Sequence, residues 1–319
     1  MVLILMAYSM KYIHLRTCEF IILIIALSIP IAAADTTRGD SARVDVSYTL
    51  DGANGSTHIH LGGTQDEMTI LFIHGLLFGL RTWDNITEAL PTDEFRTIRY
   101  DLIGQGESSN PDIRYDAVPF LHQLDEVWDF AKIDTSVVII AGSMGAIIAA
   151  LKVCESPDDV LAVILVAPAG MQHEYPWRFR LLRTPILAHP IIYLLSLSES
   201  SLRNICSDIL TPEQQDKLIP ELRQRLRKRA NRRALISTLH NFPLYDVGDV
   251  YKQLSETQIP ILVLWGAEDR VVPYPGAQAI YEQLPNAQLE LIKDGHHALQ
   301  CNSPEIVNEK IKKFLRNLN

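Results

Sequence analysis

The stretch VVIIAGSMGAIIAALK, residues 137–152, decides the fold. Its first four residues form a continuous apolar run, which is typical of a strand buried on both faces of a parallel sheet. Residues 146–152 form a run that favours a helix. Between the two lies Ala141-Gly142-Ser143-Met144-Gly145, with small residues two positions before and two positions after the serine. This pattern predicts a tight turn that holds the Ser143 hydroxyl at the sheet edge, over helix amides that favour negative charge.

Outward from this stretch, short apolar runs alternate with longer amphipathic stretches from about residue 42 onward. This alternation predicts an α/β protein with a mostly parallel, eight-stranded twisted sheet flanked by helices. The expected strands are residues 44–50, 57–61, 69–74, 95–100, 137–141, 161–167, 261–265 and 288–292.

The alternation stops between residues 169 and 258, where helical spacing dominates and no run bounded by turns resembles a strand. We therefore expect a helical cap at 169–258, inserted into a core domain made of residues 35–168 and 259–319. One helix is expected over residues 212–234, because apolar residues recur there every four positions, at Leu218, Leu222, Leu226 and Ala230. The strand pattern resumes near residue 260, and a last helix is expected over 303–318.

The first 34 residues differ from the rest of the chain. A weakly basic stretch with Lys11 and Arg16 precedes an apolar run over residues 20–31, and three alanines follow it. This is the layout of a secretory signal peptide, and it predicts an exported protein, periplasmic or secreted. The alternative is an uncleaved N-terminal membrane anchor, and Met10 is a second possible start of the chain.

Charge and cysteine content exclude two classes of site. The 29 Lys and Arg against 38 Asp and Glu give a net charge of -9. The chain therefore lacks the overall positive charge that nucleic-acid binding usually needs. Cys18 would leave with a signal peptide, and the remaining three cysteines lack the Cys-x-x-Cys spacing. An odd number without that spacing favours buried thiols over a zinc site or a disulfide scaffold.

A second motif, His74-Gly75-Leu76, ends another apolar run, and the glycines at 75 and 79 let the backbone bend toward the serine turn. Together the two motifs resemble the nucleophile elbow and oxyanion loop of the α/β-hydrolase superfamily. The resemblance implies that the amides of Leu76 and Met144 face the oxyanion that forms during acyl transfer. We interpret His74 as a residue that braces this loop.

Two further loops resemble motifs of the same superfamily. Residues 101–108, DLIGQGES, resemble its D-x-x-G-x-G-x-S turn, and we interpret Asp101 as a scaffold residue that binds backbone amides. Residues 265–273, WGAEDRVVP, resemble its acid loop. The spacing within that loop favours Asp269 over the neighbouring Glu268 as the acid that orients a histidine.

The histidine is expected at the end of the last predicted strand, in Asp294-Gly295-His296-His297. It completes the order Ser, Asp, His in which α/β-hydrolases carry their triad. The superfamily's frequent Gly-His pair points to His296, which follows Gly295. Its usual spacing of about seven residues between the histidine and the proline of the next helix points to His297, counted back from Pro304. We favour His297 and keep His296 as the alternative, because the helix anchors that end of the loop more firmly.

These residues predict a serine hydrolase that cleaves a carboxylic ester through an acyl-enzyme, with no metal or organic cofactor. The apolar residues 181–197 favour a fairly apolar small-molecule or lipid-like substrate. The basic residues between Arg223 and Arg233 are interpreted as a solvated helix face, with peripheral contact to anionic lipid headgroups as the alternative.

Other functions share part of this pattern. Ser143-Met144-Gly145-Ala146 with a helical cap also resembles hydrolases that cleave carbon-carbon bonds in ring-fission products. Peptidase, lactonase and haloperoxidase relatives carry the same motifs. A binding protein that keeps the fold without turnover is the non-enzymatic alternative.

Overall fold

The computed structural model describes residues 45–64, 67–171, 182 and 184–318. The predicted signal peptide or anchor, residues 1–34, lies outside the described residues. Within the part of the chain that is described, no helix combines the length and apolar character needed to cross a membrane. Its three cysteines are free thiols, with Cys206 and Cys301 buried and Cys154 half-buried.

All eight predicted strands form, and they join into one sheet in the order β1-β2-β4-β3-β5-β6-β7-β8. β1 and β2 form an antiparallel hairpin, β2 runs antiparallel to β4, and every other pair is parallel. The expected fold class is therefore confirmed. The strands are β1 (Val46–Gly52), β2 (Gly55–Gly62), β3 (Met68–Ile73), β4 (Phe95–Tyr100), β5 (Val137–Gly142), β6 (Val160–Val166), β7 (Ile261–Gly266) and β8 (Gln288–Ile292).

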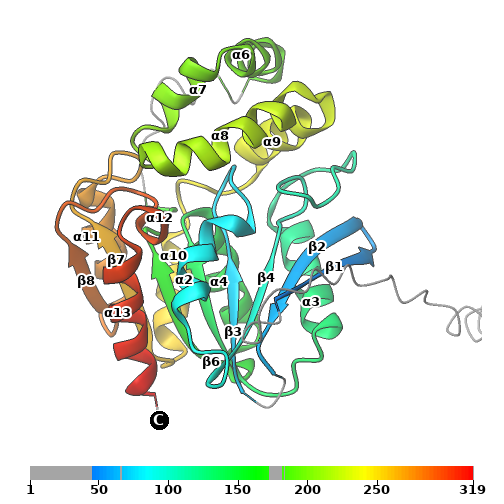
Figure 1. Cartoon of the computed structure of the whole chain (residues 1–319). Coiled ribbons are helices and arrows are strands. Elements are labelled where there is room, and N and C mark those ends of the chain that lie inside the picture. Colours follow the sequence, from blue (N-terminus) through cyan, green and yellow to red (C-terminus); the bar gives the residue numbers. More distant parts are fainter. Residues whose placement is uncertain (1–44, 65–66, 172–181, 183, 319) are drawn as a thin grey trace, which may run out of the picture. The chain divides into compact units, whose positions relative to one another are not determined.

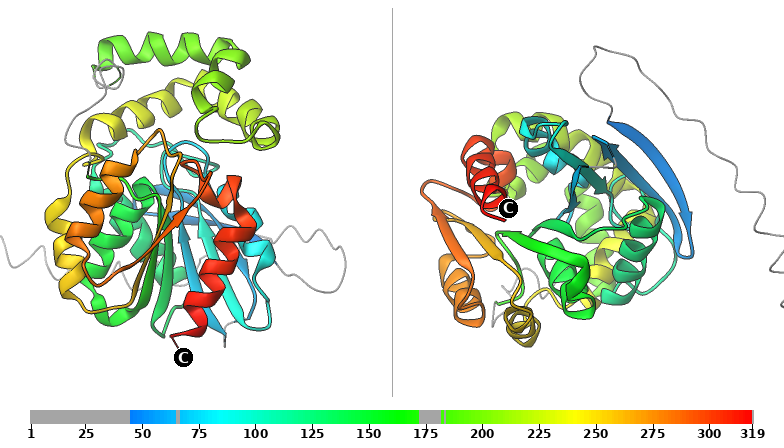
Figure 2. Two further views of the ribbon diagram at one scale, coloured as in Figure 1. Left: turned by 90° about the vertical axis from the view of Figure 1, so that its left-hand side faces the viewer. Right: turned by 90° about the horizontal axis from the view of Figure 1, so that it is seen from below.

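Helices cover both faces of the sheet, as Figures 1 and 2 show. Side chains from the two faces form separate apolar clusters. One face carries α3 (Ala117–Phe130), α4 (Met144–Glu155), α10 (Gly248–Glu256) and α11 (Tyr274–Gln283). The opposite face carries α2 (Asp84–Ala89), α12 (Leu299–Asn302) and α13 (Pro304–Arg316).

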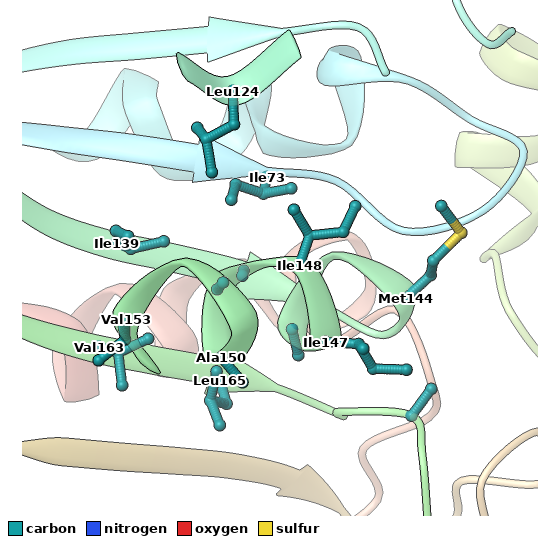
Figure 3. Packing of buried hydrophobic residues seen from close by; sticks show 14 of the residues in the cluster. Ile73, Leu124, Ile139, Met144, Ile147, Ile148, Ala150, Val153, Val163 and Leu165 are labelled. Atoms are coloured by element: carbon teal, nitrogen blue, oxygen red, sulfur yellow. The ribbon is translucent and has the colours of Figure 1, made fainter. Parts of the chain in front are cut away.

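β5, β6 and β7 are apolar throughout, as strands covered on both faces are. Ile139 on β5 belongs to the same apolar cluster as Ile148 on α4 and Val163 and Leu165 on β6, and Figure 3 shows these side chains where α4 packs on the two strands. The alternate β5 residue Ile140 belongs to the cluster on the opposite face. Packing from both sides fixes the position of the carboxyl end of β5 and therefore the position of the turn that follows it.

Four of the helices between β6 and β7 pack around a third apolar cluster, which also includes Phe78, Ala298 and Cys301 from the core. They are α6 (Pro185–Leu197), α7 (Glu199–Cys206), α8 (Pro212–Arg227) and α9 (Arg229–Asn241). Figure 1 shows them above the carboxyl ends of the strands. We call these four helices the cap helices. The division into core and cap domains remains a prediction, and α10, at the end of the 169–258 segment, packs on the sheet layer against α4 and α11.

The prediction of one helix over residues 212–234 is wrong. The helix breaks at Lys228, whose extended backbone (φ −81°, ψ 132°) separates α8 from α9. The Arg232 guanidinium donates hydrogen bonds of 2.7 Å to the carbonyls of Leu226 and Arg227, which stabilises the end of α8. Buried residues recur every four positions on both sides of the break, so the periodicity does not reveal it.

Replacing Leu124 tests the packing of α3 on the sheet. This side chain is fully buried, so Leu124→Ala should lower the free energy of unfolding by about 2–5 kcal/mol through the cavity it leaves. Val118→Ala on the same helix is the matched control, because Val118 is 55% exposed and its loss should cost less than about 0.5 kcal/mol. Urea unfolding measures both, and equal losses would contradict the packing described.

Candidate active site

Ser143 adopts a backbone conformation that residues other than glycine rarely take. Its φ of 49° and ψ of −117° place it in the left-handed half of the map, at the turn from β5 to α4. The Ser143 amide donates to the carbonyl of Val166 on β6 at 3.0 Å, and α4 begins at the next residue. The predicted strand-to-helix turn is therefore present, and its strain holds the half-buried Ser143 side chain at the sheet edge.

Gly145 lets the start of α4 rest directly on the end of β3. A Cβ at this position would lie 2.6 Å from the carbonyl oxygens of Ile73 and His74. Both are backbone atoms of a buried strand end and cannot move aside cheaply. The second small residue of the motif is thus required by close contact with β3.

Ser143, His297 and Asp269 form a continuous chain of hydrogen bonds. The Ser143 Oγ lies 3.0 Å from His297 Nε2, and His297 Nδ1 lies 2.8 Å from Asp269 Oδ2. Because a carboxylate only accepts, Nδ1 carries the donated proton and Nε2 is left to accept the Ser143 hydroxyl proton. The three residues follow β5, β7 and β8, so they meet where parallel strands end.

Asp269 is held rigidly beneath the imidazole. Its side chain is fully buried, and its second oxygen, Oδ1, accepts the amides of Val271 and Val272 at 2.8 Å each. Both oxygens are therefore engaged, one by the backbone and one by His297. The neighbouring Glu268, in contrast, is exposed.

His297 rather than His296 faces the serine. The His297 side chain is 8% exposed and bridges the two other residues. His296 is half-buried, and its Nδ1 is buried without a hydrogen-bond partner in the described residues. Of the two histidines that the sequence left open, the structure places only His297 in the hydrogen-bonded chain.

The His74-Gly75-Leu76 loop lies against Ser143. A Cβ on Gly75 would be 3.1 Å from the Ser143 Cβ, so the bare backbone of this loop approaches the serine closely. His74 braces the loop: Nε2 accepts the Leu102 amide at 2.8 Å, and Nδ1 donates to the Gly75 carbonyl at 2.6 Å. Burial lowers the pKa of His74 and keeps this imidazole neutral, as its acceptor role requires.

Asp101 organises the turn beside this loop, as the sequence predicted. Its carboxylate accepts the amides of Leu80 at 2.8 Å and Glu107 at 2.9 Å, and His58 Nδ1 at 2.8 Å. Burial alone would raise the pKa of Asp101, but the hydrogen bonds from His58 and the two amides hold it below its ordinary value. The carboxylate therefore stays ionised and acts as a fixed anchor.

Gln105 and Arg225, which the sequence motifs did not single out, hold Leu77, the next residue of the loop. Leu77 has a φ of 90°, which is strained for a side chain of this kind. Its amide donates to Gln105 Oε1 at 2.7 Å, and its carbonyl accepts Arg225 Nη2 of α8 at 2.7 Å. Gln105 lies inside a motif that the sequence analysis treated as scaffold, whereas Arg225 is 148 residues away and carries no local signal.

A small cavity lies beside Leu77, between the loop and the cap helices. Its apolar lining is Leu77, Leu222, Leu226 and Leu235, and its polar lining includes Gln105 and Arg225. The Gln105 Nε2 and the Arg225 Nε are buried donors without a partner in the described residues. No group of three or more His, Cys, Asp or Glu within those residues is arranged to hold a metal ion.

A family model described as serine aminopeptidase, S33, matches residues 64–304 of this sequence. The chain belongs to the serine aminopeptidase S33 family. Its fold is that of the α/β-hydrolases, and as an S33 family member it is a hydrolase of this fold.

Curated relatives of this S33 family member include esterases. The chain is 26% identical over 274 residues to carboxylesterase YbfK of Bacillus subtilis, covering 82% of this chain and 84% of YbfK. It is 23% identical over 258 residues to human monoacylglycerol lipase ABHD6, covering 77% and 75%. Naproxen esterase from Bacillus subtilis superposes with a TM-score of 0.66 at 17% identity, covering 86% and 92%, which shows the shared fold alone.

Gly145→Ala tests the contact between α4 and β3. The added methyl would overlap two backbone carbonyls, so we expect the free energy of unfolding to fall by about 1–3 kcal/mol. Gly248→Ala, also at the first turn of a helix, is the matched control, because its nearest neighbour would be the Met171 sulfur at 3.5 Å. Thermal unfolding compares the two, and an unchanged midpoint for Gly145→Ala would show that α4 does not rest on β3.

Proposed function

We propose that the protein is a serine carboxylic ester hydrolase with Ser143 as nucleophile, His297 as general base and Asp269 as orienting acid. The observation that carries this proposal is the unbroken hydrogen-bond chain from the Ser143 hydroxyl through the imidazole to a buried carboxylate. A hydroxyl is a weak nucleophile until a positioned base takes its proton, and this chain supplies that base.

The reaction runs in two halves. As the Ser143 Oγ attacks the ester carbonyl carbon, its proton passes to His297 Nε2, and Asp269 stabilises the imidazolium. The tetrahedral intermediate collapses, the carbon-oxygen ester bond breaks, and the alcohol leaves with the proton from the imidazolium. Water then repeats the sequence on the acyl-enzyme and releases the acid.

The amides of Leu76 and Met144 are proposed to hold the oxyanion. Met144 is the first residue of α4, and amides in the first turn of a helix have no acceptor within that helix. Leu76 follows Gly75, whose backbone lies directly against Ser143. Each such donor is worth roughly 3 kcal/mol in the transition state.

An apolar ester is the proposed substrate class. Four of the eight residues that line the cavity beside Leu77 are leucines, which would suit an apolar part of the substrate, and the buried Gln105 Nε2 would suit one of its oxygen atoms. The names of the relatives, a carboxylesterase and a monoacylglycerol lipase, support esters of this kind.

Single replacements of the three residues test the mechanism. Ser143→Ala and His297→Ala should each lower kcat by at least about 10⁴-fold, because they remove the nucleophile or its base. His296→Ala is the matched control and should retain activity, since His296 lies outside the hydrogen-bonded chain. A series of nitrophenyl esters of increasing acyl length measures the rates.

Four outcomes separate the alternatives. Equal ester rates for wild type and Ser143→Ala would remove the proposal. Inactivity of His296→Ala alone would transfer the base role to His296. Absence of Ser143 labelling by a fluorophosphonate probe in the folded protein would favour a binding protein. Turnover of a dienone or an aminoacyl amide in preference to every ester would favour a carbon-carbon hydrolase or a peptidase.

Arg225 is expected to act through the loop. Arg225→Ala frees the Leu77 carbonyl and loosens the neighbouring Leu76 amide, so kcat should fall by roughly tenfold for every acyl length, while KM changes little. Arg225→Lys should restore part of kcat because it can still donate to the carbonyl. Arg227→Ala, on an exposed residue two positions away, is the control. A loss confined to KM would assign Arg225 to substrate binding alone.

A further inference from the structure

Helix α6 is apolar on both of its faces. Its inner face packs into the cap, where Ala188 and Ile192 are buried. Its outer face carries Ile186, which is 85% exposed, and Leu194, which is 63% exposed. Three further large apolar side chains on this face are exposed: Leu187 by 45%, Tyr193 by 42% and Leu197 by 43%. A helix without a polar face is normally covered on all sides.

These side chains form one stripe. Ile186 and Leu187 lie seven residues, about two helical turns, before Tyr193 and Leu194, and Leu197 follows that pair by three to four residues. These spacings place the side chains on the same side of α6. Exposed large apolar residues elsewhere, such as Val118 on α3 and Ile306 on α13, stand on separate elements. We call Ile186, Leu187, Tyr193, Leu194 and Leu197 the α6 stripe.

Arginines from α8 and α9 flank the α6 stripe. The Arg232 guanidinium lies 4.9 Å from the centre of the Tyr193 ring. Arg223 donates to the carbonyls of Ser196 and Leu197 at the end of α6. Slight burial and, after it, the charges of Arg232, Arg229 and Arg233 lower the pKa of His189 on α6.

The positive charge is local. The chain as a whole carries a net charge of -9, yet the sequence has no Asp or Glu between Leu222 and Tyr245. Glu199 and Asp112, from outside this segment, pair with Arg223 and Arg233. Arg227, Lys228 and Arg229, at the junction of α8 and α9, are all exposed. An exposed apolar stripe beside a local cluster of cations matches the two attractions that bind a protein to an anionic lipid surface.

We propose that the α6 stripe and the flanking arginines dock the cap on an anionic lipid surface. The apolar side chains enter the acyl boundary while the guanidinium groups remain among the headgroups. A second copy of the chain fits less well, because a symmetric contact through α6 would bring two arginine clusters together. The proposal concerns a surface of the cap and stands apart from the chemistry of Ser143.

A local fluorescence reporter tests the proposal in the full chain. An environment-sensitive dye is attached at Leu194→Cys, and at Ile306→Cys as the matched control on α13. The unsubstituted chain, treated in parallel, measures labelling of the natural thiols. With phosphatidylcholine vesicles containing phosphatidylglycerol, emission at position 194 should rise severalfold and shift to shorter wavelength, while emission at position 306 stays constant. High salt should weaken the response.

A charge variant tests the part played by the arginines. In the chain labelled at position 194, Arg229→Gln should lower the apparent vesicle affinity about fivefold, whereas Arg316→Gln on α13 should leave it unchanged. Thermal unfolding confirms that the labelled chains remain folded, and all four positions are exposed.

Four results would overturn the proposal. The first is no response at position 194 with any vesicle. The second is an equal response to phosphatidylcholine alone at every salt concentration. The third is a shift that depends on protein concentration without vesicles, which would identify a second copy as the occupant. The fourth is an already shifted emission in dilute protein, which would show that a segment of the same chain covers the stripe.

Discussion

The backbone of Ser143 is the constraint on which the rest of the site depends. Its left-handed conformation is costly, and several neighbours hold it there: a β6 carbonyl takes its amide, and α4 starts at the next residue. Gly75 and Gly145 permit these contacts because a side chain at either position would crowd Ser143 or the end of β3. A relaxed turn would carry the hydroxyl away from the imidazole.

Sheet order explains how residues so far apart in the chain meet. β5, β6, β7 and β8 are parallel neighbours, so the loops that follow them emerge at one edge. Ser143, Asp269 and His297 come from three of these loops. The fourth, after β6, leads to the cap helices. The cap helices are therefore inserted after β6, the strand next to the one that carries Ser143.

The sequence predicted the strands and the loops of the site because both depend on local signals. Continuous apolar runs revealed strands covered on both faces, and glycine spacing revealed the turns. The choice between His296 and His297 could not be made this way, since adjacent side chains point in different directions and the short helix α12 that follows them has no clear sequence signal. The break at Lys228 and the contact of Arg225 with Leu77 depend on tertiary packing alone.

That last contact bears on how such enzymes can be recombined. Arg225 of α8 supplies one of the two hydrogen bonds that hold the Leu77 backbone. The cap helices and the core beneath them are therefore not independent modules. If the cap helices of another family member replaced these ones, the Leu77 carbonyl would lose its partner unless the new helices carried a cationic side chain at the position of Arg225. A chimera chosen only for its new specificity would then lose turnover for a reason unrelated to the shape of its pocket.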